Sequence, residues 1–274
     1  MKIGVMGANG FVGRSLCVKL LDEKNEVFAF YHAKKSKIPA GTQLVQVDND
    51  FNVPLDVLII AIGNYQSGAE DYANQLEAIK KSVKSMVFRK LIYISSTEVY
   101  GECDSVITED STPVHPNEYG RYKIACEAYI QSLDSYTIIR PTYLFGDDMN
   151  PGSLLPAWLE QAKTNQTITV YGDGSRKQDY LHVDDLVELC WKIIQESSSN
   201  ETINAASGHS ISNSELAHLI AKQGRQIKIK FQNEDNKKSC TYDISKARDG
   251  YNWSPSHALE KWIIHSLKYE DSHL

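Results

Sequence analysis

The sequence lacks the features of a membrane or secreted protein. No apolar run approaches the roughly 20 residues that a membrane-spanning helix needs, and no secretory signal peptide is recognisable. The cysteines are odd in number and show neither Cys-x-x-Cys pairs nor Cys/His ligand spacing: Cys17, Cys103, Cys126, Cys190 and Cys240. These absences predict a cytoplasmic protein with reduced thiols and no bound metal.

An excess of positive charge is also absent. The formal net charge is −6 over 274 residues, which argues against a non-specific nucleic-acid surface. A negatively charged substrate would therefore require a local basic pocket. The composition is otherwise that of an ordinary globular chain, with 42% hydrophobic and 23% charged residues. The length allows one α/β unit with a small additional lobe.

The N-terminal segment combines an apolar run, a glycine-rich turn and a helical pattern. Residues 1–6 predict a buried strand, and residues 14–21 predict a helix. Between them, Gly7 allows a tight turn, Gly10 allows a pyrophosphate to approach the backbone, and Gly13 lets helix pack on strand. The helix N-terminus can bind phosphate through its free N–H groups and its dipole. The segment therefore predicts a dinucleotide site formed by Gly7, Ala8, Asn9, Gly10, Phe11, Val12 and Gly13.

Strands and helices alternate after this turn, which predicts an α/β fold built on a doubly wound parallel sheet of the Rossmann type. Residues 1–146 are expected to form the dinucleotide-binding domain, and residues 147–274 mainly a smaller C-terminal substrate lobe. Whether the helix expected at 183–196 packs back on the sheet stays open. We predict strands at 27–31, 43–47, 57–62, 90–95 and 137–140, and helices at 73–86, 118–133, 154–163, 183–196 and 213–223.

Three residues have the order and spacing of a proton-transfer site beside a nicotinamide ring: Ser96, Tyr119 and Lys123. Tyr119 and Lys123 lie four positions apart and so share one face of a helix. A lysine ammonium lowers the pKa of a neighbouring phenol from its usual value of about 10. That makes a tyrosine a usable acid or base near neutral pH. Ser96 follows the expected 90–95 strand and can donate a hydrogen bond to the same substrate oxygen.

Further motifs follow in a fixed order along the chain. Gly-x-x-Gly-x-x-Gly, Ser-Ser-Thr-Glu-Val-Tyr-Gly and Tyr-x-x-x-Lys are succeeded by related segments at 140–146, 170–175, 179–185, 203–208 and 243–248. The ordered set resembles the extended short-chain dehydrogenases/reductases, in the NAD(P)-dependent epimerase/dehydratase branch that acts on nucleotide sugars. The resemblance covers essentially the whole chain. It implies a nucleotide-linked sugar or a related small molecule as substrate, and a fold that often forms homodimers.

The resemblance also implies which residues contact the cofactor. Asp48 matches the family position near the adenine, and the remaining cofactor contacts would be Ala61, Gly63, Tyr119, Lys123 and Pro141. NAD enzymes usually carry an acidic residue at the end of the second strand. Here that position is Tyr31, followed by His32, Lys34 and Lys35. The missing carboxylate and the lysines favour NADP over NAD, while the lysines also fit an ordinary solvated loop.

Several positions depart from the family pattern. Thr97 stands where sugar 4,6-dehydratases carry an aspartic acid, so dehydration is not expected, whereas Glu98 matches a family glutamate. Tyr143 replaces a substrate-binding asparagine. Gln178 replaces a family arginine that binds the substrate diphosphate. Arg176 or Lys177 is a candidate to take over this contact. The expected substrate-binding residues are Thr97, Glu98, Tyr143, Arg176 and Gln178.

The leading hypothesis is an NAD(P)-dependent oxidoreductase of a nucleotide-linked sugar, with a 4-keto-6-deoxy sugar nucleotide reductase favoured. Tyr119 would protonate the alkoxide, Ser96 would orient the oxygen, and Lys123 would tune Tyr119 and hold the nicotinamide ribose. A 4-epimerase that uses tightly held NAD is the nearest alternative. A non-catalytic dinucleotide-sensing module would be expected to have lost the tyrosine or the lysine. A substrate outside the nucleotide sugars also stays open because of Tyr143 and Gln178.

Overall fold

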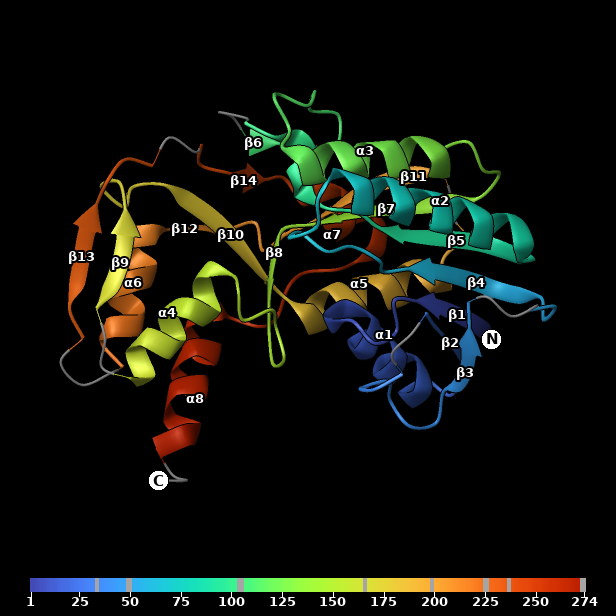
Figure 1. Ribbon diagram of the computed structural model, residues 1–274, viewed down its shortest axis with the longest axis horizontal. Coiled ribbons are helices and arrows are strands. Elements are labelled where there is room, and N and C mark those ends of the chain that lie inside the picture. The colour runs from blue at the N-terminus through green and yellow to red at the C-terminus, as the bar shows by residue number, and fades with distance from the viewer. Residues whose placement is uncertain are drawn as a thin grey trace.

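A seven-stranded parallel sheet forms the larger part of the molecule in the computed structural model (Figure 1). The structure describes residues 1–32, 35–47, 51–102, 106–164, 167–197, 200–223, 227–235 and 238–271. The strand order is β11-β7-β5-β4-β1-β2-β3. The strands are β1 (Lys2–Met6), β2 (Glu26–Tyr31), β3 (Gln43–Gln46), β4 (Leu55–Ile60), β5 (Phe88–Ile94), β7 (Tyr136–Pro141) and β11 (Glu201–Ala205).

The order of the strands determines where a ligand can bind. The chain winds outward from β1 in one direction through β2 and β3, and in the other through β4, β5 and β7. At such a reversal the connections leave the sheet on opposite sides and open a crevice at the carboxyl ends of the strands. The glycine-rich turn follows β1, and Ser96 follows β5, so both lie at this edge.

Helices cover both faces of the sheet because its strands are apolar on both sides. Ile3 and Val5 face one core, which α1 (Phe11–Asp22) and α5 (Val183–Gln195) complete. Met6 faces the opposite core, with α2 (Ala69–Ser85) and α3 (Glu118–Ile130). Strand residues alternate between faces, and strands buried on both faces are apolar throughout. The apolar run that predicted a strand at 57–62 reflects this double burial.

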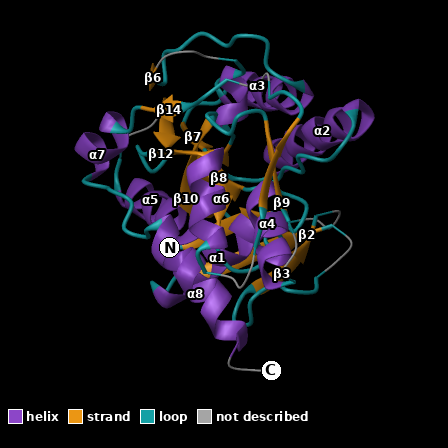
Figure 2. Cartoon of the chain, turned by 90° about the vertical axis from the view of Figure 1, so that its left-hand side faces the viewer, coloured by secondary structure: helices purple, strands orange, loops and turns teal. Residues whose placement is uncertain are grey.

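The smaller lobe is built mostly from residues that follow β7. Its core joins Phe145 and Tyr180 to the helices α4 (Leu154–Lys163), α6 (Asn213–Ala221) and α8 (Leu259–Asp271). Figure 2 turns this lobe toward the viewer and shows these three helices together. Its short strands are β8 (Tyr143–Phe145), β9 (Ile168–Tyr171), β10 (Lys177–His182), β12 (Ser210–Ser212) and β13 (Ile229–Gln232). The remaining elements are β6 (Val106–Ile107), β14 (Thr241–Tyr242), α7 (Ser245–Tyr251) and the 3-10 turn η1 (Thr97–Tyr100).

The chain does not divide cleanly at residue 146. Strand β11 comes from beyond that position and pairs with β7 at the edge of the large sheet. Helix α5 packs on the sheet through Leu186, Leu189 and Ile193, which lie in the same core as α1. Two segments of the second half of the sequence therefore belong to the dinucleotide-binding part of the fold.

Among the described residues, no helix combines the length and the apolar character needed to cross a membrane. Cys17, Cys126 and Cys190 are buried free thiols, and Cys240 is a partly buried one. Cys103 lies outside the described residues.

Candidate active site

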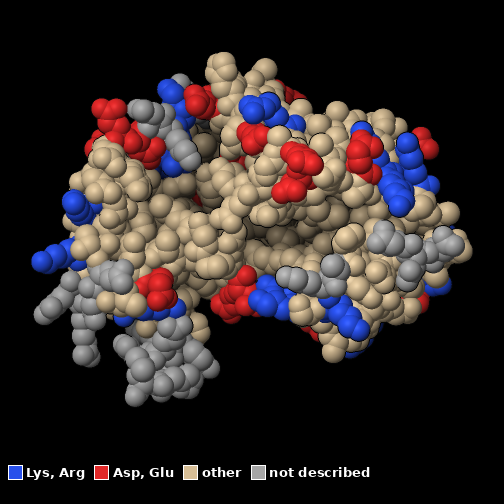
Figure 3. Space-filling model, in the orientation of Figure 1, with Lys and Arg blue, Asp and Glu red and all other residues tan. Residues whose placement is uncertain are grey.

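A cavity of about 480 Å³ opens at the carboxyl edge of the sheet. Figure 3 shows the molecule hollowed near the middle of one face, between the sheet and the smaller lobe. Residues that follow β1, β4 and β5 line the cavity together with residues of the smaller lobe. Many of the predicted site residues meet there: Phe11, Val12, Ala61, Gly63, Ser96, Thr97, Glu98, Tyr119, Lys123, Pro141, Tyr143, Arg176 and Gln178.

The glycine-rich turn has the geometry that phosphate binding requires. Gly7 has a φ of 84°, a conformation that favours glycine, and its carbonyl accepts a hydrogen bond from the Gly10 amide at 2.9 Å. A Cβ on Gly13 would lie only 2.0 Å from the Gly7 carbonyl oxygen, so helix and turn can approach this closely only with glycine. The N-cap residue of α1 is Gly10, so no N-cap side chain bonds to the first amides of this helix. Its first amides therefore suit the pyrophosphate of a dinucleotide.

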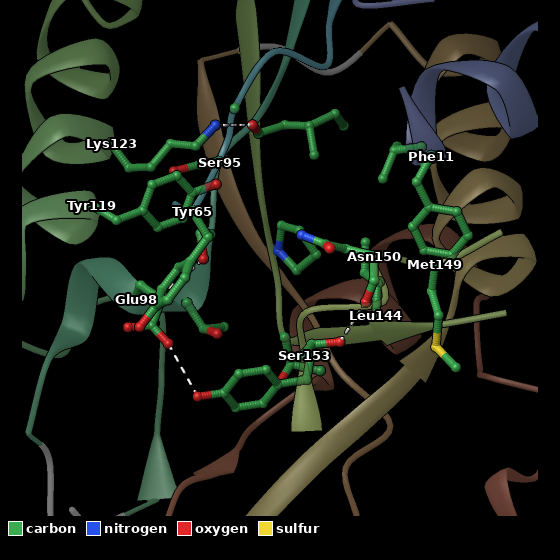
Figure 4. Close-up of a pocket in the computed structure, with 18 of the residues that line it drawn as sticks. Phe11, Tyr65, Ser95, Glu98, Tyr119, Lys123, Leu144, Met149, Asn150 and Ser153 are labelled. Atoms are coloured by element: carbon green, nitrogen blue, oxygen red, sulfur yellow. Dashed lines mark hydrogen bonds between the residues drawn. The ribbon is translucent and has the colours of Figure 1, made fainter. Parts of the chain in front are cut away.

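Tyr119 and Lys123 project from the first turns of α3 into the cavity (Figure 4). Their functional groups converge beside Gly63: a Cβ there would lie 2.9 Å from the Tyr119 hydroxyl and 3.1 Å from Lys123 Nζ. Lys123 is only 1% exposed, and its Nζ donates to the carbonyls of Ile62 at 3.0 Å and Ile94 at 2.9 Å. These bonds attach α3 to the ends of β4 and β5 and hold the ammonium in one place.

The acid strength of this pair differs from the sequence expectation. Burial is the main influence on the Tyr119 phenol and raises its pKa well above the usual value, with Tyr72 and Glu98 raising it further. Burial also lowers the pKa of Lys123 to about 8, opposed by Cys126 and Glu127. The pKa of Tyr119 is therefore raised in this structure and not lowered, and burial is the main cause. Tyr119 is held protonated at neutral pH, as a proton donor must be.

Ser96 is positioned by the backbone that follows β5. It caps the turn η1, and its Oγ accepts a hydrogen bond from the Glu98 amide at 3.2 Å. A hydroxyl that accepts through oxygen still has its own proton to donate. Ser96 can therefore offer that proton to a substrate oxygen in the cavity.

Glu98 connects η1 to α3 and to the smaller lobe. Its Oε2 accepts from Asn117 Nδ2 at 2.5 Å, and its Oε1 accepts from the Tyr143 hydroxyl at 3.2 Å. Asn117 also caps α3 by accepting from the Gly120 amide at 2.8 Å. A Cβ on Gly120 would lie 2.2 Å from the Glu98 carbonyl oxygen, so only glycine fits where the turn meets the helix. The turn that carries Ser96 and the helix that carries Tyr119 are thus held as one unit.

A buried ion pair supports the same helix from behind. Arg140 on β7 donates to both carboxylate oxygens of Glu127, from Nε at 3.0 Å and from Nη2 at 2.7 Å. The two side chains are 13% and 5% exposed. Ser95 Oγ donates to the same carboxylate at 2.5 Å, and Arg140 also donates to the Tyr100 hydroxyl at 2.9 Å. The pair links β5, β7 and α3, the elements on which Ser96, Tyr119 and Lys123 depend.

The smaller lobe contributes a second polar region to the cavity. Arg176 faces Asp235, with 3.7 Å between Nη1 and Oδ2, and its Nε donates to the Lys238 carbonyl at 3.4 Å. Gln178 is buried and donates to Asn213 Oδ1 at 2.7 Å. Arg176 and Gln178 both line the cavity, the first with a cationic side chain and the second with a neutral amide.

Other predicted residues lie away from the cavity lining. Tyr31 ends β2 and is partly buried, and His32 after it is exposed. Lys34 and Asp48 lie outside the described residues. The turn residues Gly7, Ala8, Asn9, Gly10 and Gly13 are absent from the lining, although Phe11 and Val12 of the same segment belong to it.

The structure also adds residues that the sequence interpretation missed. Tyr65, in the loop after β4, places its ring edge-on to Tyr119 with centroids 5.3 Å apart. Gln66 of the same loop approaches Gly152 of the smaller lobe, where a Cβ would lie 2.6 Å from Gln66 Nε2. The position of this loop after a parallel strand was the available signal. Met149, Asn150 and Ser153 also line the cavity, and no motif marks them.

The fold and the site together define a dinucleotide-dependent enzyme with a serine, a tyrosine and a lysine around one cavity. Residues 3–206 match the model of the NAD dependent epimerase/dehydratase family. The chain belongs to this family, as its motifs implied, and its cofactor is a nicotinamide dinucleotide.

Two curated relatives illustrate the range of similarity. The low-salt glycan biosynthesis protein Agl12 of Haloferax volcanii is 29% identical over 66% of this chain, and the match spans 61% of that protein. The probable GDP-L-fucose synthase 1 of Oryza sativa is 26% identical over 98% of this chain and 91% of its own length.

Solved structures share the fold across the whole chain. The UDP-glucuronic acid 4-epimerase of Bacillus cereus, in complex with UDP-glucuronic acid and NAD, has a TM-score of 0.83 at 21% identity and covers 100% of both chains. The UDP-glucose 4-epimerase of Thermotoga maritima, with UDP-glucose, has a TM-score of 0.82 at 21% identity and covers 100% of this chain and 99% of its own.

Proposed function

We propose that this protein is an NAD(P)-dependent oxidoreductase of a nucleotide-linked sugar, and that it reduces a 4-keto sugar. The observation that carries the proposal is the convergence of the Tyr119 hydroxyl and the Lys123 ammonium beside Gly63, in a cavity that Ser96 and the first turn of α1 also line. Such a site can hold a carbonyl oxygen next to a proton donor.

The bound dinucleotide would supply hydride to the carbonyl carbon. Tyr119 donates its proton to the oxygen as negative charge develops there, and the phenol carries that proton at neutral pH. Ser96 donates a hydrogen bond that orients and polarises the same oxygen. Lys123 sets the local positive charge and is the candidate contact for the nicotinamide ribose. Its two backbone acceptors fix the direction of the ammonium.

Two features support reduction over dehydration. Thr97 is buried and cannot supply the carboxylic proton that elimination of water requires at this position. The Tyr143 hydroxyl donates a hydrogen bond to Glu98, and Tyr143 occupies the position of the family asparagine. The full-length similarity to a probable GDP-L-fucose synthase is consistent with a reductase. The 4-epimerase is the alternative because curated relatives named UDP-glucose 4-epimerase match 100% of this chain at 24% identity.

Cofactor turnover separates the two reactions. We expect UDP-, dTDP- or GDP-linked 4-keto-6-deoxyhexoses to be consumed with stoichiometric oxidation of NADPH. The oxidation is measured as the loss of absorbance of the reduced nicotinamide. No dehydrated product should form from the matching 4-hydroxy sugars. Interconversion of UDP-glucose and UDP-galactose without net loss of reduced cofactor would instead establish the epimerase. Thr97→Asp alone should not create a dehydratase, because elimination also needs a base aligned at C5.

We propose further that NADP is preferred over NAD, because Tyr31 occupies the position at which NAD enzymes carry a carboxylate that binds the ribose 2′-hydroxyl. Tyr31→Asp should weaken NADP more than NAD, by about 1.5–3 kcal/mol, since the new carboxylate repels the 2′-phosphate. Isothermal titration with both cofactors measures the difference. Tyr31→Asn is the matched neutral control and should leave the ratio of the two affinities near that of the wild type. Equal weakening of both cofactors by Tyr31→Asp would count against the NADP preference.

At the other end of the substrate, Arg176 is our candidate for the diphosphate contact. Arg176 lines the cavity together with the neutral Gln178, and its side chain is only 15% exposed. Arginine suits this role because its planar fork can donate two parallel hydrogen bonds to phosphate oxygens.

A further inference from the structure

Lys123 places a cation in the interior of the protein, and the contacts of that cation extend beyond the cavity. The residue is only 1% exposed, and burial is the main influence on its pKa, which falls to about 8. Glu127 opposes this effect but is itself paired with Arg140. Removing an ammonium from water costs free energy unless other groups stabilise its charge. The groups in contact with Lys123 Nζ therefore determine whether this lysine is charged at neutral pH.

The face of an aromatic ring lies next to this ammonium. Tyr93 is on β5, is completely buried, and belongs to the core that α3 covers. Lys123 Nζ lies over the Tyr93 ring, 4.7 Å from its centroid. The rings of Tyr119 and Tyr122, on the same helix as Lys123, are each 5.7 Å away. A cation within about 6 Å of a ring centroid is attracted by the electron-rich face, and more strongly where water is excluded.

The ring and the backbone act on the ammonium in different ways. The carbonyls of Ile62 and Ile94 accept two of its N–H groups and fix its position. Tyr93 immediately precedes Ile94, so the end of β5 supplies both the ring and one of these carbonyls. The attraction to the ring acts on the positive charge, and most of it is lost when the lysine gives up its proton. Tyr93 therefore favours the charged form of Lys123.

We propose that Tyr93 is a positioning residue for the reaction, and that the face of its ring keeps the Lys123 ammonium charged and in place beside Tyr119 at neutral pH. The consequence for turnover rests on the proposed function, in which Lys123 supplies the positive charge of the site. The contact between ring and ammonium does not depend on the substrate.

The other ionisable groups around the ammonium keep their charge near neutral pH. Those that face it from β5 and α3 are Tyr93, Tyr119, Tyr122, Cys126 and Glu127. Burial raises the pKa of the three phenols and of the thiol, so these groups remain neutral. Glu127 remains paired with Arg140. A change in the titration of Lys123 can therefore be attributed to the altered ring.

The test changes the electron density of the ring and keeps its size nearly constant. Position 93 is filled with Phe, with 4-fluorophenylalanine or with 3,4,5-trifluorophenylalanine, because each fluorine weakens the attraction of the ring face for a cation. Trifluorophenylalanine at Phe28, a buried ring of β2 that is not part of the cavity lining, is the matched control. The pKa of Lys123 is measured without cofactor by NMR of lysine labelled with carbon-13 at Cε, and Lys123→Arg identifies its signal. Thermal unfolding checks that each variant is folded.

Tyr93→Phe should leave the pKa of Lys123 within a few tenths of its wild-type value, because phenylalanine keeps the ring face. Trifluorophenylalanine at position 93 should lower that pKa by about one pH unit relative to Tyr93→Phe, and 4-fluorophenylalanine by a smaller amount. The control at position 28 should not change it. An unchanged pKa in the fluorinated position-93 variants, or an equal change in the control, would overturn the inference. If trifluorophenylalanine prevents folding, the smaller change in the 4-fluoro variant decides the question.

The same variants provide a kinetic readout. Because the site needs the charged lysine, turnover of a 4-keto sugar with NADPH should be lost as pH rises through the pKa of Lys123. In the trifluoro variant this loss should begin about one pH unit lower than in Tyr93→Phe. A pH profile that does not move although the pKa of Lys123 has fallen would refute the effect on turnover. Absence of turnover on every 4-keto sugar would count against the proposed function, whereas the NMR titration would still decide whether Tyr93 stabilises the ammonium.

Discussion

Replacing Tyr119 with Phe should reduce turnover by roughly 10²–10⁴ and leave cofactor affinity nearly unchanged. The substitution removes the hydroxyl beside Gly63 and keeps the ring. Tyr119 packs against Tyr65, Tyr72 and Tyr122, with ring centroids 5.3, 5.9 and 6.1 Å away, so the helix and the cavity should keep their shape. Steady-state kinetics with saturating cofactor, and a separate titration of cofactor binding, measure the two quantities.

Tyr122 provides the matched control on the same helix. Its ring belongs to the same aromatic group, but its hydroxyl donates to Gln75 at 3.3 Å and the residue is not part of the cavity lining. Tyr122→Phe should therefore keep turnover within a few-fold of the wild type. Wild-type turnover in Tyr119→Phe would show that another group donates the proton. Equal losses in both variants would point to disturbed packing rather than lost chemistry.

Replacing Arg140 with Met should lower the free energy of unfolding by about 3–5 kcal/mol, because it leaves the Glu127 carboxylate buried without its counterion. Glu127 is 5% exposed and loses two charge-assisted hydrogen bonds. The hydrogen bond from Ser95 remains and cannot neutralise the charge. Urea unfolding of the wild type and the variant measures the loss, provided that both unfold in a single transition.

The double variant Arg140→Met/Glu127→Leu distinguishes two causes of the lost stability, the unpaired Glu127 charge and the loss of packing. Replacing a buried ion pair by apolar residues of similar size is often close to neutral, so the double variant should recover much of the stability. Additive losses from the two single substitutions would contradict this explanation. Turnover should fall in Arg140→Met even at temperatures where it remains folded, because the pair connects β5 and β7 to the helix of Tyr119 and Lys123.

Local patterns predicted the elements that position the site. The apolar run before Gly7 and the glycine spacing after it predicted β1, the turn and α1, because each depends on residues adjacent in sequence. The spacing of Tyr119 and Lys123 predicted a shared helix face for the same reason, and α3 begins at Glu118 as expected. Helices α4, α5 and α6 also lie within a few residues of their predicted bounds.

Contacts between distant segments could not be predicted in this way. Nothing near residue 201 indicates that β11 joins the large sheet beside β7, because the pairing depends on how α5 returns the chain. The partners of Glu98 come from Asn117 and Tyr143, which are 19 and 45 positions away. The contact of Gln66 with Gly152 across the cavity likewise joins the two parts of the fold.

The sequence by itself determined the fold class, the family and the identity of the three candidate catalytic groups, since short-range periodicity and motif spacing carry that information. The tertiary structure alone decided their chemical state. Tyr119 is more weakly acidic than its neighbour Lys123 suggested, because the pKa of a phenol depends on how completely the whole fold removes it from water. The tertiary structure also brings Glu98 and Arg176 into the lining of one cavity. Desolvation and charge at a site are sums over all the elements that surround it, and no single segment of sequence contains them.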